Sequence, residues 1–161
     1  MGAREEINAE IDFVGTVAPE GADRLDEVKL AAWMDAHVAG FRGPLALTKF
    51  KGGQSNPTYK IEAPSGNYVL RRKPFGPLLP SAHAVDREFK VQAGLYPTGF
   101  PVSRQYGLCT DDSVLGTWFY VMGMVDLDSI IAERIPLSQI NEGFETMKKG
   151  DSARSVIVFD Q

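Results

Sequence analysis

The stretch Phe50-Lys-Gly-Gly-Gln-Ser-Asn-Pro-Thr-Tyr59 decides how the chain is interpreted, because it places a glycine-rich turn between two strand-like segments. Residues 45–51 before the turn and 59–63 after it alternate apolar and polar side chains, as half-buried strands do. Adjacent glycines followed by small polar side chains let backbone N–H groups approach an anion such as phosphate. An ordinary hairpin turn would also need glycine here, and on this loop alone the hairpin is the favoured interpretation.

Downstream of this loop the pattern predicts more of an antiparallel sheet. A turn at residues 64–67 and a third strand at 68–71 complete a three-stranded meander. After a connection rich in proline, we expect a helix over residues 83–95. Strands at 106–109 and 117–125 follow, so that the sequence predicts an α+β fold of five strands with one inserted helix.

The segment before the sheet predicts a leader and a helix. Residues 1–22 are polar and broken by glycine and proline, which indicates a flexible leader. A helix is expected from Asp23, acting as its cap, to near Gly40.

For the inserted helix after the third strand, Ser81 is the expected cap.

Composition narrows the classes of partner. The net charge of −4 and the scattered basic residues argue against nucleic acid as a partner. No apolar run approaches the ~20 residues that cross a bilayer, so no membrane association is expected. The single cysteine, Cys109, cannot form an intramolecular disulfide or a cysteine-rich metal site, and this predicts a cytoplasmic protein with no bound structural metal.

A strand cation and a helix carboxylate are the candidate chemical pair. Arg71 ends the third strand, and Glu88 lies on the inserted helix that follows. A carboxylate that contacts a cation can fix its direction and hold it ready for a phosphate. The alternative is that both charges are simply solvated, which is the usual state of a strand end.

The order of the motifs resembles a known family. The quoted Phe50–Tyr59 stretch is followed by Tyr68-Val-Leu-Arg-Arg-Lys-Pro74, Leu78-Leu-Pro-Ser-Ala-His83, Asp86-Arg-Glu-Phe89 and Trp118-Phe-Tyr-Val-Met122. Together, over residues 25–126, they resemble the aminoglycoside phosphotransferase and choline kinase-like family. The closest likeness is to the branch also found fused to acyl-CoA dehydrogenases. Several spaced motifs in the right order are more specific than any one of them.

This resemblance implies a protein-kinase-like N-terminal lobe over residues 23–126 that binds ATP. The glycine-bearing loop would cover the phosphates, Arg71 would replace the usual phosphate-pairing lysine, and Glu88 would be its partner. The end of the last strand would be the hinge that meets adenine. The implied nucleotide-binding residues are Gly52, Gly53, Gln54, Ser55, Asn56, Arg71, Glu88, Met122, Gly123 and Val125.

The transfer machinery of the family has no counterpart in the sequence. The family resemblance implies a His-Gly-Asp catalytic loop and a later aspartate motif for Mg²⁺, but His37 and His83 are the only histidines and neither precedes Gly-Asp. We therefore expect no catalytic residue and no magnesium ligand in this chain, and we expect a truncated phosphotransferase that is inactive alone. The acceptor is a small molecule that the sequence does not identify.

The last part, residues 127–161, predicts a separate helix–strand tail. A helix opened by Pro136 and Ser138, with Ile140, Phe144 and Met147 as its apolar stripe, should be followed by a strand at 154–159. This tail resembles the C-terminal end of zinc-dependent medium-chain alcohol dehydrogenases. The sequence has neither a dinucleotide-binding glycine fingerprint nor a zinc-binding set, so we expect a chimera or rearrangement.

Two other functions stay open from the sequence. The chain could be a noncatalytic nucleotide-binding or interaction module, consistent with the missing aspartate loop. It could also be a fragment of an alcohol dehydrogenase fusion, which only the tail supports. In either case apolar faces that have lost their partners predict self-association through exposed hydrophobic surface.

Overall fold

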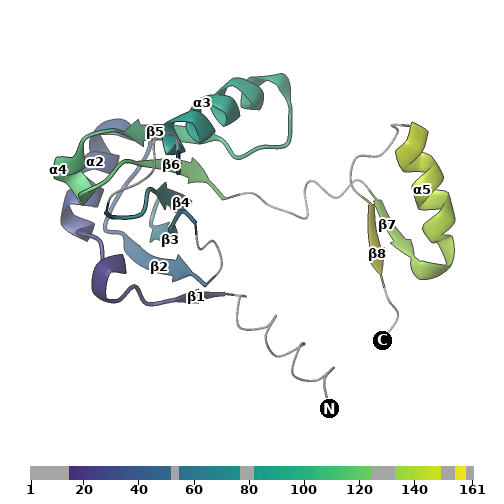
Figure 1. Ribbon diagram of the computed structural model, residues 1–161, viewed down its shortest axis with the longest axis horizontal. Helices are drawn as coiled ribbons and strands as arrows, with labels where there is room; N and C mark the ends of the chain where they lie inside the picture. The colour runs from purple at the N-terminus through teal and green to yellow at the C-terminus, as the bar shows by residue number, and fades with distance from the viewer. Residues whose placement is uncertain (1–14, 52–54, 77–81, 125–132, 150–154, 159–161) are drawn as a thin grey trace, which may run out of the picture. The chain divides into compact units, whose positions relative to one another are not determined.

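The computed structural model describes residues 15–51, 55–76, 82–124, 133–149 and 155–158, and the chain divides into two compact units at Met124/Val125. The first unit is an antiparallel sheet in the order β1-β2-β3-β4-β6-β5, with helices packed on it (Figure 1). Its strands are β1 Thr16–Val17, β2 Ala46–Phe50, β3 Thr58–Ala63, β4 Gly66–Arg72, β5 Gln105–Cys109 and β6 Phe119–Gly123.

The meander and the inserted helix are confirmed. Strands β2, β3 and β4 pair in sequence order, with Lys49 opposite Tyr59 and Tyr59 opposite Leu70. Helix α3, Val85–Leu95, lies between β4 and β5 in the chain, and β6 then pairs with both β4 and β5. The α+β, kinase-like lobe expected from the sequence is therefore present, with six strands in place of five.

The sixth strand, β1, lies in the segment from which the sequence predicted only a leader. Thr16 pairs with Phe50 and Val17 with Lys49, and the 3₁₀ helix η1, Gly21–Asp23, follows. A strand of two exposed residues has no apolar alternation to reveal it, and its place at the sheet edge comes from pairing with β2.

Helix α2, Glu27–His37, begins three residues later than predicted. Its cap is Asp26, whose carboxylate accepts hydrogen bonds from the N–H groups of Val28 and Lys29 at 3.1 and 3.0 Å. Asp23 is not the cap, because its carboxylate is held by Arg72 and Lys49. The predicted cap of α3, Ser81, lies outside the described residues, and the observed N-cap is Ala84, which makes no side-chain capping bond.

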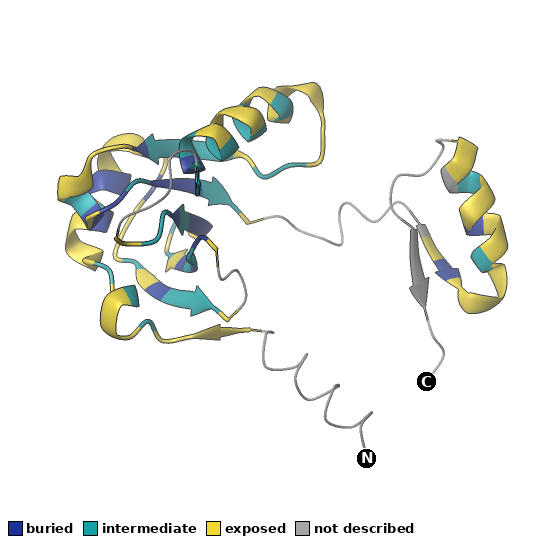
Figure 2. Ribbon diagram, in the orientation of Figure 1, coloured by how far each residue is buried: buried dark blue, intermediate teal, exposed yellow. Residues whose placement is uncertain are grey.

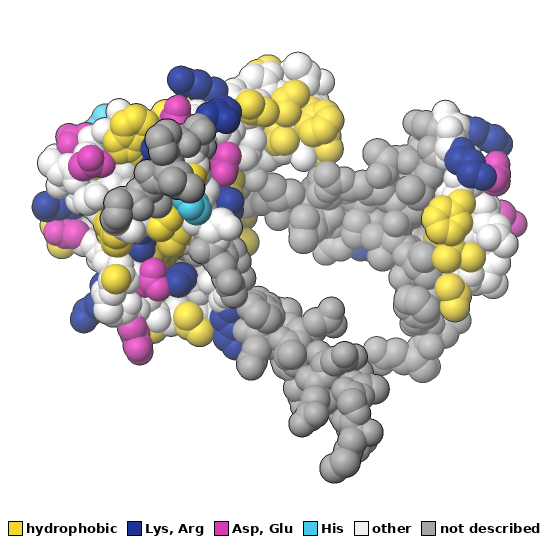
Figure 3. Space-filling view, viewed as in Figure 1, with side chains coloured by type: hydrophobic (Ala, Val, Ile, Leu, Met, Phe, Trp, Pro, Cys, Tyr) yellow, Lys and Arg dark blue, Asp and Glu magenta, His cyan; other side chains and the backbone are white. Residues whose placement is uncertain are grey.

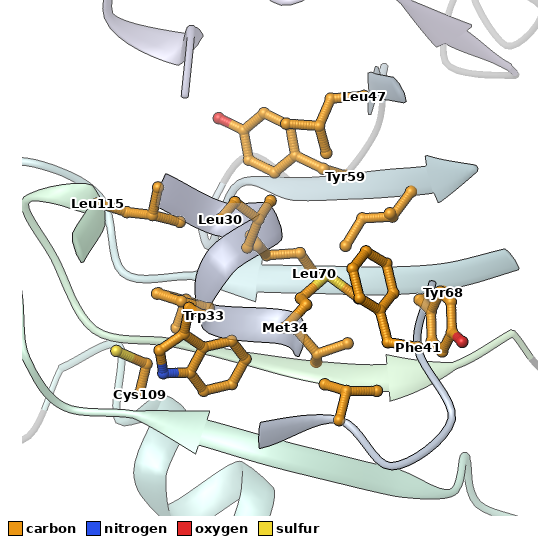
Figure 4. Close-up of a cluster of buried hydrophobic side chains, with 14 residues drawn as sticks. Leu30, Trp33, Met34, Phe41, Leu47, Tyr59, Tyr68, Leu70, Cys109 and Leu115 are labelled. Atoms are coloured by element: carbon orange, nitrogen blue, oxygen red, sulfur yellow. The ribbon is translucent and has the colours of Figure 1, made fainter. Parts of the chain in front are cut away.

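The hydrophobic core lies between α2 and one face of the sheet (Figures 2 and 4). Leu30 and Met34 of α2 are fully buried, and Trp33 packs edge-on against Phe119 with ring centroids 4.8 Å apart. From the sheet, Tyr68 and Leu70 of β4 point into the same cluster. Each large apolar side chain buried in this way contributes about 1.5–3 kcal/mol.

Arg72, at the end of β4, lies on the same face of the sheet as Tyr68 and Leu70 and is only 2% exposed. Its guanidinium donates to the Tyr59 hydroxyl at 3.2 Å, to the Ala22 carbonyl at 3.3 Å and to Asp23 Oδ1 at 3.2 Å. It also stacks over the ring of Phe75, 4.1 Å from the centroid. Arg72 therefore fastens the 22–23 segment to the sheet.

The second unit is a small βαβ arrangement. Strands β7, Glu133–Pro136, and β8, Ser155–Val158, are parallel, and the 3₁₀ helix η4, Leu137–Gln139, leads into α5, Ile140–Lys149. The predicted helix and following strand are present, but Pro136 ends a strand that the sequence did not predict, and it does not open the helix.

Gly143 of α5 faces Ile135 of β7 in this unit. A Cβ built at Gly143 would clash with Cδ1 of Ile135, so a larger residue there would require the Ile135 side chain to move. Gly143 is buried, while Phe144, predicted on the apolar stripe, is 52% exposed. The side chain of Met147 is outside the described set.

We expect Arg72→Leu to destabilise the first unit by about 2 kcal/mol, because Asp23 and the Tyr59 hydroxyl lose a buried partner. Urea unfolding measures the change, and hydrogen exchange should show faster exchange in residues 21–23. The matched control is Arg71→Leu, one residue away on the opposite face and 29% exposed, which should cost less than about 1 kcal/mol. Equal losses in both variants would contradict the assigned role of Arg72.

Candidate functional site

Strand alternation places the candidate site on the sheet face opposite the core. In β4, Tyr68, Leu70 and Arg72 face α2, so Arg71 between them faces α3. Arg71 pairs across the sheet with Thr58 of β3 and Tyr120 of β6. Helix α3 packs over this face, with the ring of Phe89 edge-on to Tyr120 at a centroid distance of 6.1 Å.

The contact predicted between Arg71 and Glu88 is present. Nε of Arg71 donates to Oε2 of Glu88 at 2.8 Å, and the two side chains are 29% and 35% exposed. Nη1 of Arg71 makes a longer bond, 3.4 Å, to Oγ1 of Thr58. Within the part of the chain that the structure describes, Nη2 has no hydrogen-bond partner, so the guanidinium keeps a donor for another group.

Glu88 accepts hydrogen bonds from three separate segments. Besides Arg71, the Tyr120 hydroxyl donates to Oε2 at 3.1 Å, and Nδ2 of Asn56 donates to Oε1 at 3.1 Å. A carboxylate held by three donors has little freedom to turn. Glu88 therefore fixes the position of Arg71 relative to α3 and to the 55–57 turn.

Asn56 is the buried member of this group, at 3% exposure. While its amide nitrogen donates to Glu88, its Oδ1 lies 2.7 Å from Nδ1 of His83. Both ends of the amide are thus engaged in joining the turn before β3 to the turn before α3. Its predicted neighbour Ser55 is exposed.

Burial, followed by the nearby negative charge of Glu88, raises the pKa of the Tyr120 hydroxyl to about 12. The hydroxyl therefore stays protonated and remains a donor to Glu88 at neutral pH. Neither Tyr120 nor His83 was among the predicted site residues. Strand alternation could have identified Tyr120, which shares a face with Arg71, whereas His83 ends the motif at residues 78–83 without any sign of its contact with Asn56.

Next to this network the surface is hollowed, with a cavity volume of about 710 Å³. Turn 55–56, Arg71, the turn 82–84 and the first half of α3 line it. Its charged or titratable groups are Arg71, His83, Arg87 and Glu88, and Arg71 and Glu88 neutralise each other. We call this cavity the α3 hollow. Arg87 and the N-terminal end of α3 leave it with a positive bias that suits an anion.

The other predicted nucleotide residues lie elsewhere or outside the description. Met122 and Gly123 end β6, with Met122 opposite Val69 and Gln105, and neither lines the α3 hollow. The N–H of Gly123 donates to the Arg104 carbonyl at 2.8 Å, so this N–H already has a partner, and the adenine contact of Gly123 stays a prediction. Gly52, Gly53, Gln54 and Val125 are not among the described residues.

Two further properties of the described residues bear on the kind of site. No group of three or more His, Cys, Asp or Glu side chains among them is arranged to hold a metal ion. None of the helices in the described ranges is long and apolar enough to cross a membrane.

A sheet with one inserted helix, whose carboxylate holds a cation on a central strand, is the amino-terminal lobe of a kinase-like fold. The model of the phosphotransferase enzyme family matches residues 46–141, and this chain belongs to that family. The match extends past residue 126, so the predicted boundary between the lobe and the tail stays a prediction.

Individual relatives agree with this family. The mouse protein "Acyl-CoA dehydrogenase family member 11" is 48% identical over 103 residues, which are 62% of this chain and 13% of the relative. A crystal structure from Ralstonia eutropha, described as that of "a putative aminoglycoside phosphotransferase", is 45% identical with a TM-score of 0.56. It is covered over 29% of its length and covers 64% of this chain.

A third relative has a different name. "Geraniol dehydrogenase" of Carpoglyphus lactis is 32% identical over 100 residues, 62% of this chain and 20% of the relative. The resemblance of residues 127–161 to alcohol dehydrogenases stays a prediction. This chain spans less than a third of each of these three relatives.

The raised pKa of Tyr120 predicts an alkaline loss of stability. Because the folded chain favours the neutral phenol, this stabilisation is complete below the ordinary pKa of 10.0 and is lost as pH rises through about 12. Over that interval Tyr120 should account for a fall of about 3 kcal/mol in the free energy of unfolding. Urea unfolding at increasing pH measures the free energy of unfolding. The fall that is due to Tyr120 should be absent in Tyr120→Phe.

The matched control is Tyr96→Phe, since Tyr96 is 45% exposed. That variant should keep the alkaline fall of the wild type. At neutral pH, Tyr120→Phe should cost about 1 kcal/mol through the lost bond to Glu88. An unchanged alkaline profile in Tyr120→Phe would mean that the phenol is not protected as described.

Proposed function

We propose that this chain forms the ATP-binding lobe of a small-molecule phosphotransferase, in which Arg71 holds the nucleotide phosphates. The single observation that carries the proposal is the ion pair of Arg71 and Glu88 at 2.8 Å, beside a hollow with a positive bias. A guanidinium offers a fork of donors to phosphate oxygens, and with Nε bonded to Glu88 and Nη1 to Thr58, Nη2 is the donor without a partner among the described residues.

The remaining contacts are proposed from the likeness to the family. We propose that Gly52, Gly53, Gln54 and Ser55 supply backbone N–H groups over the phosphates, while Asn56 supports Glu88 through its side chain. The adenine would lie beside the C-terminal end of β6, near Met122 and Val125. We assign no adenine contact to the N–H of Gly123, since Arg104 already accepts it.

Phosphoryl transfer itself requires Mg²⁺ ligands and a residue that accepts the proton of the acceptor hydroxyl. We propose that residues outside this chain supply both and bind the small-molecule acceptor, so that this chain alone is inactive. A cytoplasmic location is part of the proposal, because the only cysteine, Cys109, is a buried free thiol.

A noncatalytic nucleotide-binding module is the second candidate. The observation that favours it is the sequence itself, in which no His-Gly-Asp loop occurs. An assay of ATP turnover with Mg²⁺ separates the two candidates. Sustained turnover by this chain in complex with a protein that supplies the Mg²⁺ ligands and the proton acceptor supports the first candidate. Turnover by this chain alone would contradict both.

Self-association is a further proposal, supported by exposed apolar side chains. Hydrophobic side chains gather over the far end of α3 and the loop that follows (Figure 3), where Tyr96 and Phe100 are 45% and 54% exposed. Exposed apolar patches of this kind favour association.

The test of nucleotide binding is Arg71→Met. We expect this variant to bind ATP about tenfold more weakly than the wild type, because the phosphates lose a charge-assisted hydrogen bond. Arg71→Lys should fall between the two, since it keeps the charge without the fork. Isothermal titration calorimetry on the 161-residue chain measures the affinities.

The matched control is Arg42→Met, which removes an exposed arginine that does not line the hollow. Its affinity for ATP should equal that of the wild type. If Arg71→Met and Arg42→Met bind ATP equally well, Arg71 does not hold the phosphates.

A further inference from the structure

The inference concerns His83, which takes an unusual backbone conformation at the edge of the α3 hollow. Its φ is 54°, and it is the one non-glycine residue among those described that has a positive φ. A left-handed conformation costs a non-glycine residue roughly 1–2 kcal/mol, and such residues cluster at binding sites. The carbonyl of His83 accepts a hydrogen bond from the N–H of Val85 at 2.8 Å, at the start of α3.

The hydrogen bonds around His83 fix its tautomer. Nδ2 of Asn56 must be the atom that meets the Glu88 carboxylate, because the amide oxygen would be repelled there. Oδ1 of Asn56 therefore faces His83 and can only accept, so Nδ1 of His83 carries the proton at this 2.7 Å contact. The other ring nitrogen, Nε2, is then the atom that changes when the imidazole gains a proton.

The surroundings of the imidazole favour an anion. His83 lines the hollow together with Arg71 from β4 and Arg87 and Glu88 from α3, the other charged side chains of its wall. Glu88 is already bonded to Arg71, Asn56 and Tyr120, which leaves it less able to act as the partner of His83. The cationic form of His83 presents an N–H at Nε2, whereas the neutral form presents a lone pair that repels phosphate oxygens.

We propose that His83 is a phosphate-binding residue of this site, acting as an imidazolium through Nε2 and oriented through Nδ1 by Asn56. This role of His83 rests on the proposed nucleotide function. It extends that function, because binding of the triphosphate would be coupled to uptake of a proton. The left-handed backbone at His83 and the buried Asn56 both serve to aim the ring.

The expected signature is a pH dependence of affinity that belongs to His83. Because the cationic form alone presents an N–H at Nε2, the binding of ATP should be about tenfold tighter at pH about 6 than at pH about 8. Asparagine tolerates a left-handed backbone and can still donate to Oδ1 of Asn56. His83→Asn should therefore keep the fold and the Arg71–Glu88 pair while it loses the gain in affinity at low pH.

Calorimetric titration of the 161-residue chain with ATP, and separately with inorganic tripolyphosphate, tests the proposal. The ATP titration at one pH in two buffers of different ionisation enthalpy should show proton uptake by the wild type and less by His83→Asn. His37→Asn is the matched control. His37 belongs to α2 on the other face of the sheet and stacks on Trp33, so that variant should keep the wild-type pH dependence.

The outcomes separate this inference from the function on which it rests. Binding that depends on Arg71 but has the same pH dependence in wild type and His83→Asn overturns the role of His83 alone. Absence of ATP and tripolyphosphate binding at both pH values overturns the proposed function, and the role of His83 with it. Loss of the pH-dependent gain in His83→Asn, with the proton uptake reduced, supports the role.

Discussion

The two-residue repeat of β4 is the constraint on which the first unit depends. Because successive side chains of a strand point to opposite faces, Arg71 and Arg72 cannot serve the same side of the sheet. Arg72 is buried and ties the 22–23 segment to the core, while Arg71 meets Glu88 over the other face. A shift of one residue in the pairing of β4 would exchange the two arginines and expose Tyr68 and Leu70.

The order of motifs carries more information than any single motif in this chain. The sheet and the inserted helix were predictable. The strands alternate apolar and polar side chains, and the turns between the elements are rich in glycine or proline. The meeting of Arg71 and Glu88 was predictable only through the likeness to a family of known architecture. Composition and spacing alone left both residues as solvated charges.

What the sequence did not reveal are interactions between residues distant in the chain. Asp23 has the sequence context of a helix cap, but its hydrogen bond with Arg72, 49 residues later, determines its position. Pro136 has the sequence context of a helix start, but in the structure it ends β7, which pairs in parallel with β8. His83 ends a motif of the family, but that motif does not show its partner, because Asn56 comes from the turn before β3. Such long-range contacts have no local signature.

The cluster around Glu88 has a consequence for how a ligand would meet this surface. Arg71 is oriented before any ligand arrives, by bonds among side chains of β3, β4, β6, α3 and the turn before β3. A preoriented receptor loses little conformational entropy on association. Recognition here would therefore be nearer to lock-and-key than to induced fit, and a change far from the hollow that loosens Glu88 would weaken affinity without altering which ligand is preferred.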